Sequence, residues 1–368
     1  MKLIERAALV IVTILISSCS GQQNHKAVLD RFNQKKRIAI EKESSLNTVL
    51  NPKSIRLMND VLLIKSVGTD DYLMSVIDTS DFKELARFGS QGKGPNEIGV
   101  MGFINKLSND LVLVSDLSDF NNYLFSIQNI LSGDLAPSRV FKVKNKKEGV
   151  NSCLDFIYLN SGKNIVGTGI HGEGRYALYD EDGVLVNYYI EYPQLENIKS
   201  DNELLQAITF QAALTQPKEN RYFASLSRGV IDILEYSPEL GINLVTRKKY
   251  YKDKLKYCGN TMYAGVEYPL VATTSKSIIG FEGDHFESNS KYIYSLFSDK
   301  KYEDFKERHS KPQYMDLVTF DWNGDPHTHY QLDREVIGFA VSDDNKTVFF
   351  LAYNEEGEPV VLKSRINS

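Results

Sequence analysis

The chain lacks the features that mark several common protein classes. Its 368 residues include one Trp, three Cys and ten Pro, and no apolar run reaches the length of about 20 residues that a membrane-spanning helix needs. Three cysteines provide no disulfide framework, and no CxxC or Cys/His spacing indicates zinc. A net charge of −5 gives no basic footprint for nucleic acid. With 42% hydrophobic and 25% charged residues, the composition is that of a folded globular protein.

Motifs of the common catalytic classes are also missing. The sequence has no GxSxG elbow and no HExxH pair. The glycine-rich stretch 89–97 does not fit a phosphate-binding loop, because Lys93 is followed by Gly94-Pro95 and then by strand-like sequence. The sequence therefore predicts no catalytic residue, no metal site and no cofactor.

The N-terminal residues predict export. A start with Lys2 and Arg6, an apolar run from Ala7 to Ile16 and then Ser17-Ser18-Cys19 form the pattern of a secretory signal. Ile16 to Cys19 also resemble the lipobox of bacterial lipoproteins, in which cleavage precedes the cysteine and the thiol is acylated. We expect residues 1–18 to be removed and Cys19 to be lipidated. The alternative is a plain secretory signal with an incidental cysteine.

The lipobox resemblance implies an outer-membrane address. No acidic cluster follows Cys19, which favours the periplasm-facing leaflet. Residues 19–36 are polar, with scattered charges and no sustained period, and they predict a flexible tether.

Beyond the tether, the sequence consists of short alternating runs rich in Val, Ile, Leu, Phe and Tyr, broken by Gly, Asn and Asp clusters. Such runs indicate β-strands. They recur in units of four at intervals of roughly fifty residues, which is typical of a β-propeller. We therefore predict an all-β fold, a six-bladed propeller over residues 37–368. The sixth unit has only three runs, so the N-terminal strand Arg37–Glu41 is expected to complete the last blade and close the ring.

One long stretch departs from this pattern. Residues 281–314 are charged and aromatic, and they are predicted to be an insertion in the fifth blade. Long connections within compact repeats are often lids or binding loops, and the alternative is a solvated excursion on the rim. The other strands of that blade are expected at Met262–Leu270, Ser277–Gly280, Met315–Asp321 and His327–Leu332.

A family resemblance comes from the second unit. Arg87–Glu97 is a glycine-rich crossover, Val112–Asp116 is a strand ending in a small residue and Asp, and Asn122–Phe125 follows with Asn and an apolar strand. This order resembles the NHL-type propeller repeat. Together with the lipobox, it resembles the TolB-like six-bladed propeller lipoproteins of Bacteroides-type bacteria. The resemblance implies the fold and the address, and it implies no particular activity.

Propeller topology suggests where a ligand would bind. Strands within a blade are antiparallel, so the loops between second and third strands share a face with the blade-to-blade crossovers. Propeller ligands often gather on that face, over the channel mouth. The candidate ligand-binding residues in these loops are Asp116, His171, Arg175, Arg228, Asp284 and His285. The alternative for each is a solvated loop residue.

Two classes of function remain open. The first is a non-catalytic binding or scaffolding module for a protein or glycan, attached to the outer membrane only through its lipid. The second is an enzyme at the channel mouth, such as a metal-dependent lactonase or a glycan-active hydrolase or lyase. Three or more carboxylate, Asn or His side chains converging on one point of the channel would favour the second.

Overall fold

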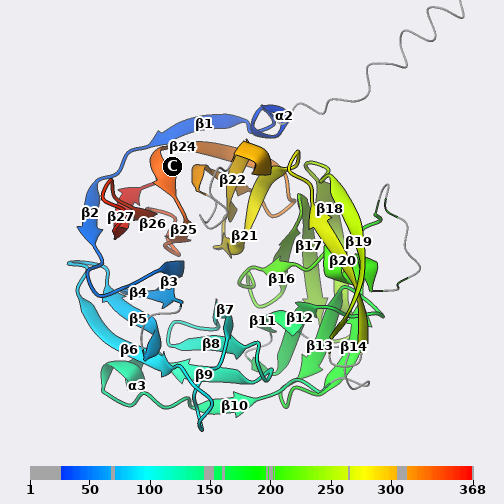
Figure 1. Cartoon of the computed structure of the whole chain (residues 1–368), viewed down its shortest axis with the longest axis horizontal. Coiled ribbons are helices and arrows are strands. Elements are labelled where there is room, and N and C mark those ends of the chain that lie inside the picture. Colours follow the sequence, from blue (N-terminus) through cyan, green and yellow to red (C-terminus); the bar gives the residue numbers. More distant parts are fainter. Residues whose placement is uncertain are drawn as a thin grey trace, which may run out of the picture.

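The structure is a computed structural model that describes residues 26–67, 71–144, 153–159, 162–195, 198, 202, 204–263, 266–304 and 313–366. The described residues form seven β-sheets, six of which are arranged in a ring around a central axis, with β3, β7, β21 and β25 nearest the centre (Figure 1). The predicted all-β, six-bladed propeller is confirmed. Residues 1–25, which include the predicted signal peptide and Cys19, lie outside the described residues. Within the described ranges, no helix is both long and apolar enough to cross a bilayer.

Four blades follow the simple order in which each strand pairs with the next in sequence. The first blade comprises β3 (Pro52–Met58), β4 (Val61–Ser66), β5 (Tyr72–Asp78) and β6 (Glu84–Ser90). The second comprises β7 (Met101–Lys106), β8 (Leu111–Asp116), β9 (Asn122–Ser126) and β10 (Arg139–Phe141), with α3 (Ile127–Leu131) before β10. The third comprises β11 (Cys153–Leu159), β12 (Asn164–Gly169), β13 (Tyr176–Asp180) and β14 (Leu185–Tyr189). The fourth comprises β15 (Ala213–Leu214), β16 (Tyr222–Ser227), β17 (Val230–Ser237) and β18 (Gly241–Lys249), preceded by α4 (Leu205–Thr209).

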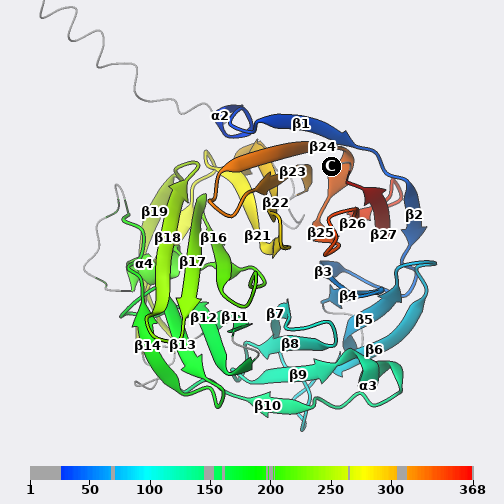
Figure 2. The same ribbon diagram turned by 180° about the vertical axis from the view of Figure 1, so that it is seen from behind.

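The N-terminal residues complete the last two blades. The fifth blade comprises β21 (Ile278–Ser288), β22 (Ile293–Lys301), β23 (Tyr314–Phe320) and β24 (Pro326–Val336), and the sixth comprises β25 (Gly338–Val341), β26 (Thr347–Tyr353) and β27 (Pro359–Arg365). β1 (Gln34–Ile38) adds a fifth, parallel strand to β24, and β2 (Lys42–Ser45) adds the fourth strand to β27. Figures 1 and 2 both show β1 running along the outside of β24.

Closure of the ring by an N-terminal strand is therefore confirmed, with a different residue range. Of the strand expected at Arg37–Glu41, only Arg37 and Ile38 lie in a strand, at the end of β1, and residues 39–41 connect β1 to β2. Ile38 explains why β1 pairs with the fifth blade, because its side chain is buried there in the core that includes Tyr330 and Leu332. The predicted tether also differs in its second half: α2 (Lys26–Leu29) precedes Phe32, and Val28 and Phe32 are buried against the propeller.

The prediction of an insertion at 281–314 is corrected by the structure. Its first part belongs to β21 and its next part is β22, both strands of the fifth blade, and η2 (Tyr302–Asp304) follows. The excursion from the ring is instead a separate two-stranded sheet of β19 (Leu255–Tyr263) and β20 (Val266–Thr273). Both segments are alternating and aromatic, so periodicity alone does not show which of them joins the blade.

The core of the propeller lies between the blades. Six clusters of buried apolar side chains each join one blade to the next among the described residues. Phe88 and Phe125, for example, pack edge to face between the first and second blades with ring centroids 4.9 Å apart. Gly183 and Gly324 lie in hairpin turns with positive φ values of 75°, a conformation that glycine adopts without strain.

Candidate functional site

Asp116, the first predicted ligand residue, organises a loop. It ends β8, and its carboxylate accepts hydrogen bonds from the backbone N–H groups of Gly99, Val100 and Ser118. Burial would raise the pKa of Asp116, but the hydrogen bonds from Ser118 and the loop amides outweigh it and lower the pKa. The side chain is buried, so its role in the structure is to hold the crossover from the first to the second blade.

His171 is enclosed in the third blade. It is fully buried, its ring lies 5.3 Å from that of Tyr188, and its Nε2 lies 3.7 Å from the sulfur of Cys153. Burial lowers the pKa of His171 to about 4. The imidazole is therefore neutral at physiological pH and is enclosed in the protein interior.

Arg175 is also buried, between the third and fourth blades. Its Nη1 lies 2.8 Å from Oδ2 of Asp232, and the side chains of this pair are 1% and 0% exposed. Arg247 binds the same carboxylate through Nε and Nη2 at 2.7 and 2.8 Å, and the Tyr176 hydroxyl donates to it. Burial would raise the pKa of Asp232, but the two guanidinium groups hold it below its ordinary value. This cluster joins two blades.

Asp284 and His285 do not lie in a loop at the channel mouth. Both are part of β21, the inner strand of the fifth blade, at a point where its register with β22 shifts. Their side chains lie outside the described residues. The expected position was wrong because it depended on the predicted insertion, whose first part is this strand.

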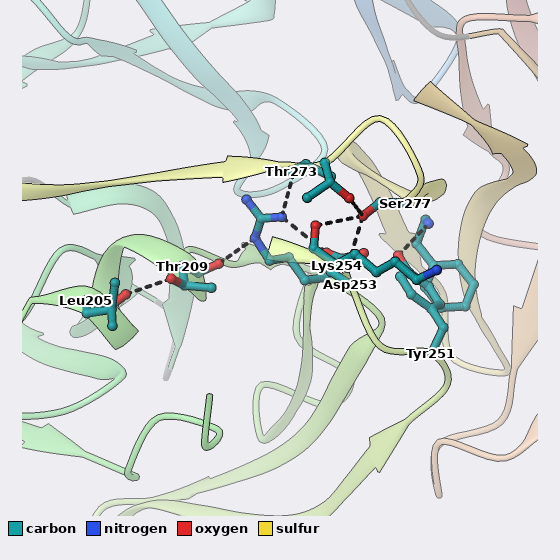
Figure 3. A network of polar contacts seen from close by, with 10 residues as sticks. Leu205, Thr209, Tyr251, Asp253, Lys254, Thr273 and Ser277 are labelled. Carbon is teal, nitrogen blue, oxygen red and sulfur yellow. Dashed lines mark hydrogen bonds and ion pairs between the residues drawn. The ribbon is translucent and has the colours of Figure 1, made fainter. Parts of the chain in front are cut away.

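Arg228 is the predicted residue that reaches the channel. It occupies the two-residue turn between β16 and β17 with a φ of 45°, a left-handed conformation that is uncommon for arginine. Its Nε donates to the carbonyl oxygen of Thr209 at 2.8 Å, and its Nη1 contacts Asp253 Oδ2 at 3.1 Å and Thr273 Oγ1 at 3.0 Å. Figure 3 shows Thr209, Asp253 and Thr273 converging on this guanidinium.

The elements around Arg228 fix its position. Thr209 ends α4, and its hydroxyl donates to the Leu205 carbonyl. Thr273 ends β20, and the N–H of the following Thr274 donates to Lys254, next to Asp253. The β19–β20 hairpin thus delivers one partner to the guanidinium and helps to hold a second.

This network borders a cavity of about 580 Å³ at one end of the channel, here called the wide cavity. Its outer part is lined by the turn and crossover residues Arg228, Asp253, Thr273 and Tyr302. The inner strands supply the charged side chains Lys53, Arg56 and Asp155 to its walls, and the second strand of the first blade, β4, supplies Lys65. This is the face on which propeller topology predicts ligands to gather.

The narrow cavity, of about 350 Å³, lies at the opposite end. It is lined by loops between first and second strands, such as residues 106–109 and 216–219. Arg56, Asn105, Leu214 and Phe286 line both cavities and so form the boundary between them. Arg56 is held there by the carbonyls of Ile104 and Ile55 and lies 3.8 Å from Oε1 of Glu287.

Two carboxyl groups near this boundary have perturbed acidity. Burial raises the pKa of Asp155 to about 6, against hydrogen bonds from the Leu214 N–H and the Asn105 amide. Burial also raises the pKa of Glu287 to about 7, against the charge of Arg56. Buried carboxyls with raised pKa in a channel are suited to proton transfer or to pH-dependent binding.

A family model described as TolB-like 6-blade propeller-like matches residues 31–344. The chain belongs to the TolB-like six-bladed propeller family. No curated protein matches it. The crystal structure of a candidate exported protein from Bacteroides fragilis NCTC 9343 is similar, with a TM-score of 0.53 and 12% identity over 91% of this chain and 99% of that one. At this identity the likeness concerns the fold alone.

Within this TolB-like propeller, sequence reasoning missed most residues that line the channel. Lys53, Arg56 and Asp155 belong to inner strands, and nothing in an alternating run marks the position that faces the axis. One signal was available: a charged residue at an otherwise apolar position of a first strand, as in Leu154-Asp155-Phe156. Among the described residues, no group of three His, Cys, Asp or Glu side chains is placed to hold a metal ion.

Proposed function

We propose that this TolB-like propeller is an exported, lipid-anchored binding module that holds a glycan or protein ligand at the outer membrane, with the wide cavity as its binding site. The observation that carries this proposal is the Arg228 network. A half-exposed guanidinium is fixed by three partners at the mouth of a cavity whose volume of about 580 Å³ falls within the range of about 300–1,000 Å³ for ligand sites.

The address rests on the sequence. The apolar run 7–16 and the lipobox-like Ile16 to Cys19 support export and acylation of Cys19. Two or more acyl chains would hold the protein stably, because a single chain binds a bilayer only marginally. Nucleic acid is not a proposed partner, since the chain carries a net charge of −5.

Acylation is tested by metabolic labelling with an alkyne fatty acid, followed by membrane fractionation. The wild-type protein is expected to take up the label and to sediment with the outer membrane. The Cys19→Ala variant is expected to lose both properties. Membrane association that persists in unlabelled Cys19→Ala protein would contradict the lipid anchor.

Ligand binding is tested by cross-linking and pull-down from solubilised membranes, in parallel with a glycan array. The wild-type protein is expected to retain a protein or glycan that Arg228→Asn loses, while Lys218→Gln at the narrow cavity retains it. Recovery of no ligand by either method would contradict the proposal, as would a ligand that both variants retain.

A glycan-active enzyme is the second candidate, and the acidity of Glu287 and Asp155 favours it. With a pKa of about 7, Glu287 is partly protonated at neutral pH, as a general acid must be. Release of reducing ends from bacterial-surface or host glycans by wild-type protein, and its loss in both Glu287→Gln and Asp155→Asn, would establish this candidate. Absence of any such release would exclude it for the glycans tried.

A further inference from the structure

We propose that the wide cavity recognises an acidic sugar, a hexuronic acid unit whose carboxylate meets Arg228. This inference rests on the proposed function and names its ligand class. Three features of the cavity carry it: its charge, the free end of the Arg228 guanidinium, and an unpartnered hydroxyl beside that arginine.

The charge of the wide cavity is opposite to that of the protein. The described ionisable residues that line it are four cations, Lys53, Arg56, Lys65 and Arg228, and two carboxylates, Asp155 and Asp253. The narrow cavity has three cations and three carboxylates, and the chain as a whole carries a net charge of −5. A recess with an excess of one sign and low-dielectric walls concentrates ions of the other sign. The wide cavity is therefore the end of the channel that attracts an anion.

Arg228 presents a preorganised donor to that anion. Its Nε and Nη1 are used by Thr209, Asp253 and Thr273, whereas Nη2 makes no hydrogen bond or ion pair to a described residue. The Arg228 side chain is 29% exposed and lines the wide cavity. A guanidinium that is already fixed loses little entropy on binding, and its donors match carboxylate geometry. The left-handed backbone of Arg228 fits a residue retained for function despite local strain.

Ser227 gives the independent observation. Its side chain is 4% exposed and lines the wide cavity, and its Oγ has no hydrogen-bond partner among the described residues. A buried hydroxyl without a partner costs free energy unless a ligand or water satisfies it. Ser227 precedes Arg228 in the chain, and both residues line the same cavity.

The remaining lining favours a polyhydroxylated anion over an acidic peptide. Amide and hydroxyl side chains suited to sugar hydroxyls line the same space: Ser54, Asn105, Thr209, Gln211 and Thr273. Tyr302 is 42% exposed and also lines the cavity, so its ring can cover the apolar face of a pyranose. A glutamate side chain would supply the carboxylate but no hydroxyl groups to meet these polar side chains.

The test is isothermal titration of the lipidated protein in detergent with digalacturonate, with the neutral galactose disaccharide and with triglutamate. Digalacturonate is expected to bind at least tenfold more tightly than either comparison ligand, with an affinity that falls as salt rises. Arg228→Asn should weaken it at least tenfold and Ser227→Ala several-fold. Lys218→Gln, the matched loss of a cation at the narrow cavity, should leave it unchanged.

Asn adopts left-handed turn positions readily, so Arg228→Asn should keep the melting temperature of the wild type. Equal or tighter binding of the neutral disaccharide or of triglutamate would overturn the inference, as would undiminished binding by Arg228→Asn. If digalacturonate does not bind while the array or pull-down recovers another ligand, the inference fails and the proposed function stands. If neither assay recovers a ligand, the proposed function itself fails.

Discussion

Arg175 and Arg228 occupy comparable places in neighbouring blades but differ in their surroundings. Each lies in a connection between the second and third strands of its blade, and each pairs with an aspartate. The Arg175–Asp232 pair is almost completely buried and shares its carboxylate with Arg247. The Arg228–Asp253 pair is 29% and 10% exposed and borders the wide cavity.

The two pairs differ in burial and not in residue type, and burial decides whether the guanidinium can be reached from a cavity. Arg175 is enclosed with its charge compensated, so it can only hold the third blade to the fourth. Its Nε and Nη2 have no hydrogen-bond partner among the described residues, but both are buried away from any ligand. Arg228 keeps a comparable donor at the surface of a cavity, where a ligand can use it.

The largest expected effect comes from breaking the buried pair. Asp232→Ala leaves the charges of Arg175 and Arg247 together without a counter-ion, and we expect it to lower the free energy of unfolding by about 3–5 kcal/mol. The matched variant Asp253→Ala should cost about 1 kcal/mol, because its pair is partly solvated. Urea unfolding measures both. Similar losses in the two variants would contradict the assigned difference between the pairs.

An intermediate effect is expected at the Arg56–Glu287 pair, which lies between the two cavities. The pKa of Glu287 is raised in the folded protein from 4.5 to about 7. The folded protein therefore binds this proton more tightly than the unfolded chain, so the free energy of unfolding contributed by Glu287 falls as the pH rises through that interval. The fall is on the order of 3 kcal/mol.

Glu287→Gln should remove this pH dependence. The difference in unfolding free energy between pH 5 and pH 8 is expected to shrink relative to the wild type, while the acceptor for the Val341 N–H remains. Chemical denaturation at the two pH values measures the change. An unaltered pH profile would show that Glu287 does not titrate in this range.

The smallest effect on stability is expected at Arg228. Arg228→Asn loses the bonds to Thr209, Asp253 and Thr273 but relieves the left-handed backbone, so the free energy of unfolding should stay within about 1 kcal/mol of the wild type. Thermal melting and urea unfolding check this. A loss as large as that of Asp232→Ala would identify Arg228 as a structural residue like Arg175.

Much of the fold could be predicted because strand signals are local. Alternating apolar runs and the turns at Gly183 and Gly324 depend on neighbours in sequence, and the second blade carries a repeat pattern. The fifth blade could not be divided correctly, because the β19–β20 hairpin and the β21–β22 pair both consist of alternating aromatic segments. Which pair joins β23 depends on packing against the fourth and sixth blades.

The candidate site was harder to predict from the sequence than the fold. Topology predicted the face, and it placed Arg228 there. It could not show that Asp116 is used by loop amides, that His171 is enclosed beside Cys153, or that Arg175 faces Asp232 across two blades. These contacts join residues that are 17 to 57 positions apart along the chain.

The sequence by itself determined the strand content, the repeated four-strand unit of the first four blades and the need for an N-terminal strand to close the ring, because each depends on period and on local turn chemistry. Only the tertiary structure decided which charged side chains face the channel and which are buried between blades. The orientation of a side chain around the axis depends on the twist and packing of whole sheets. Two arginines with equivalent positions in their blades thus receive different surroundings.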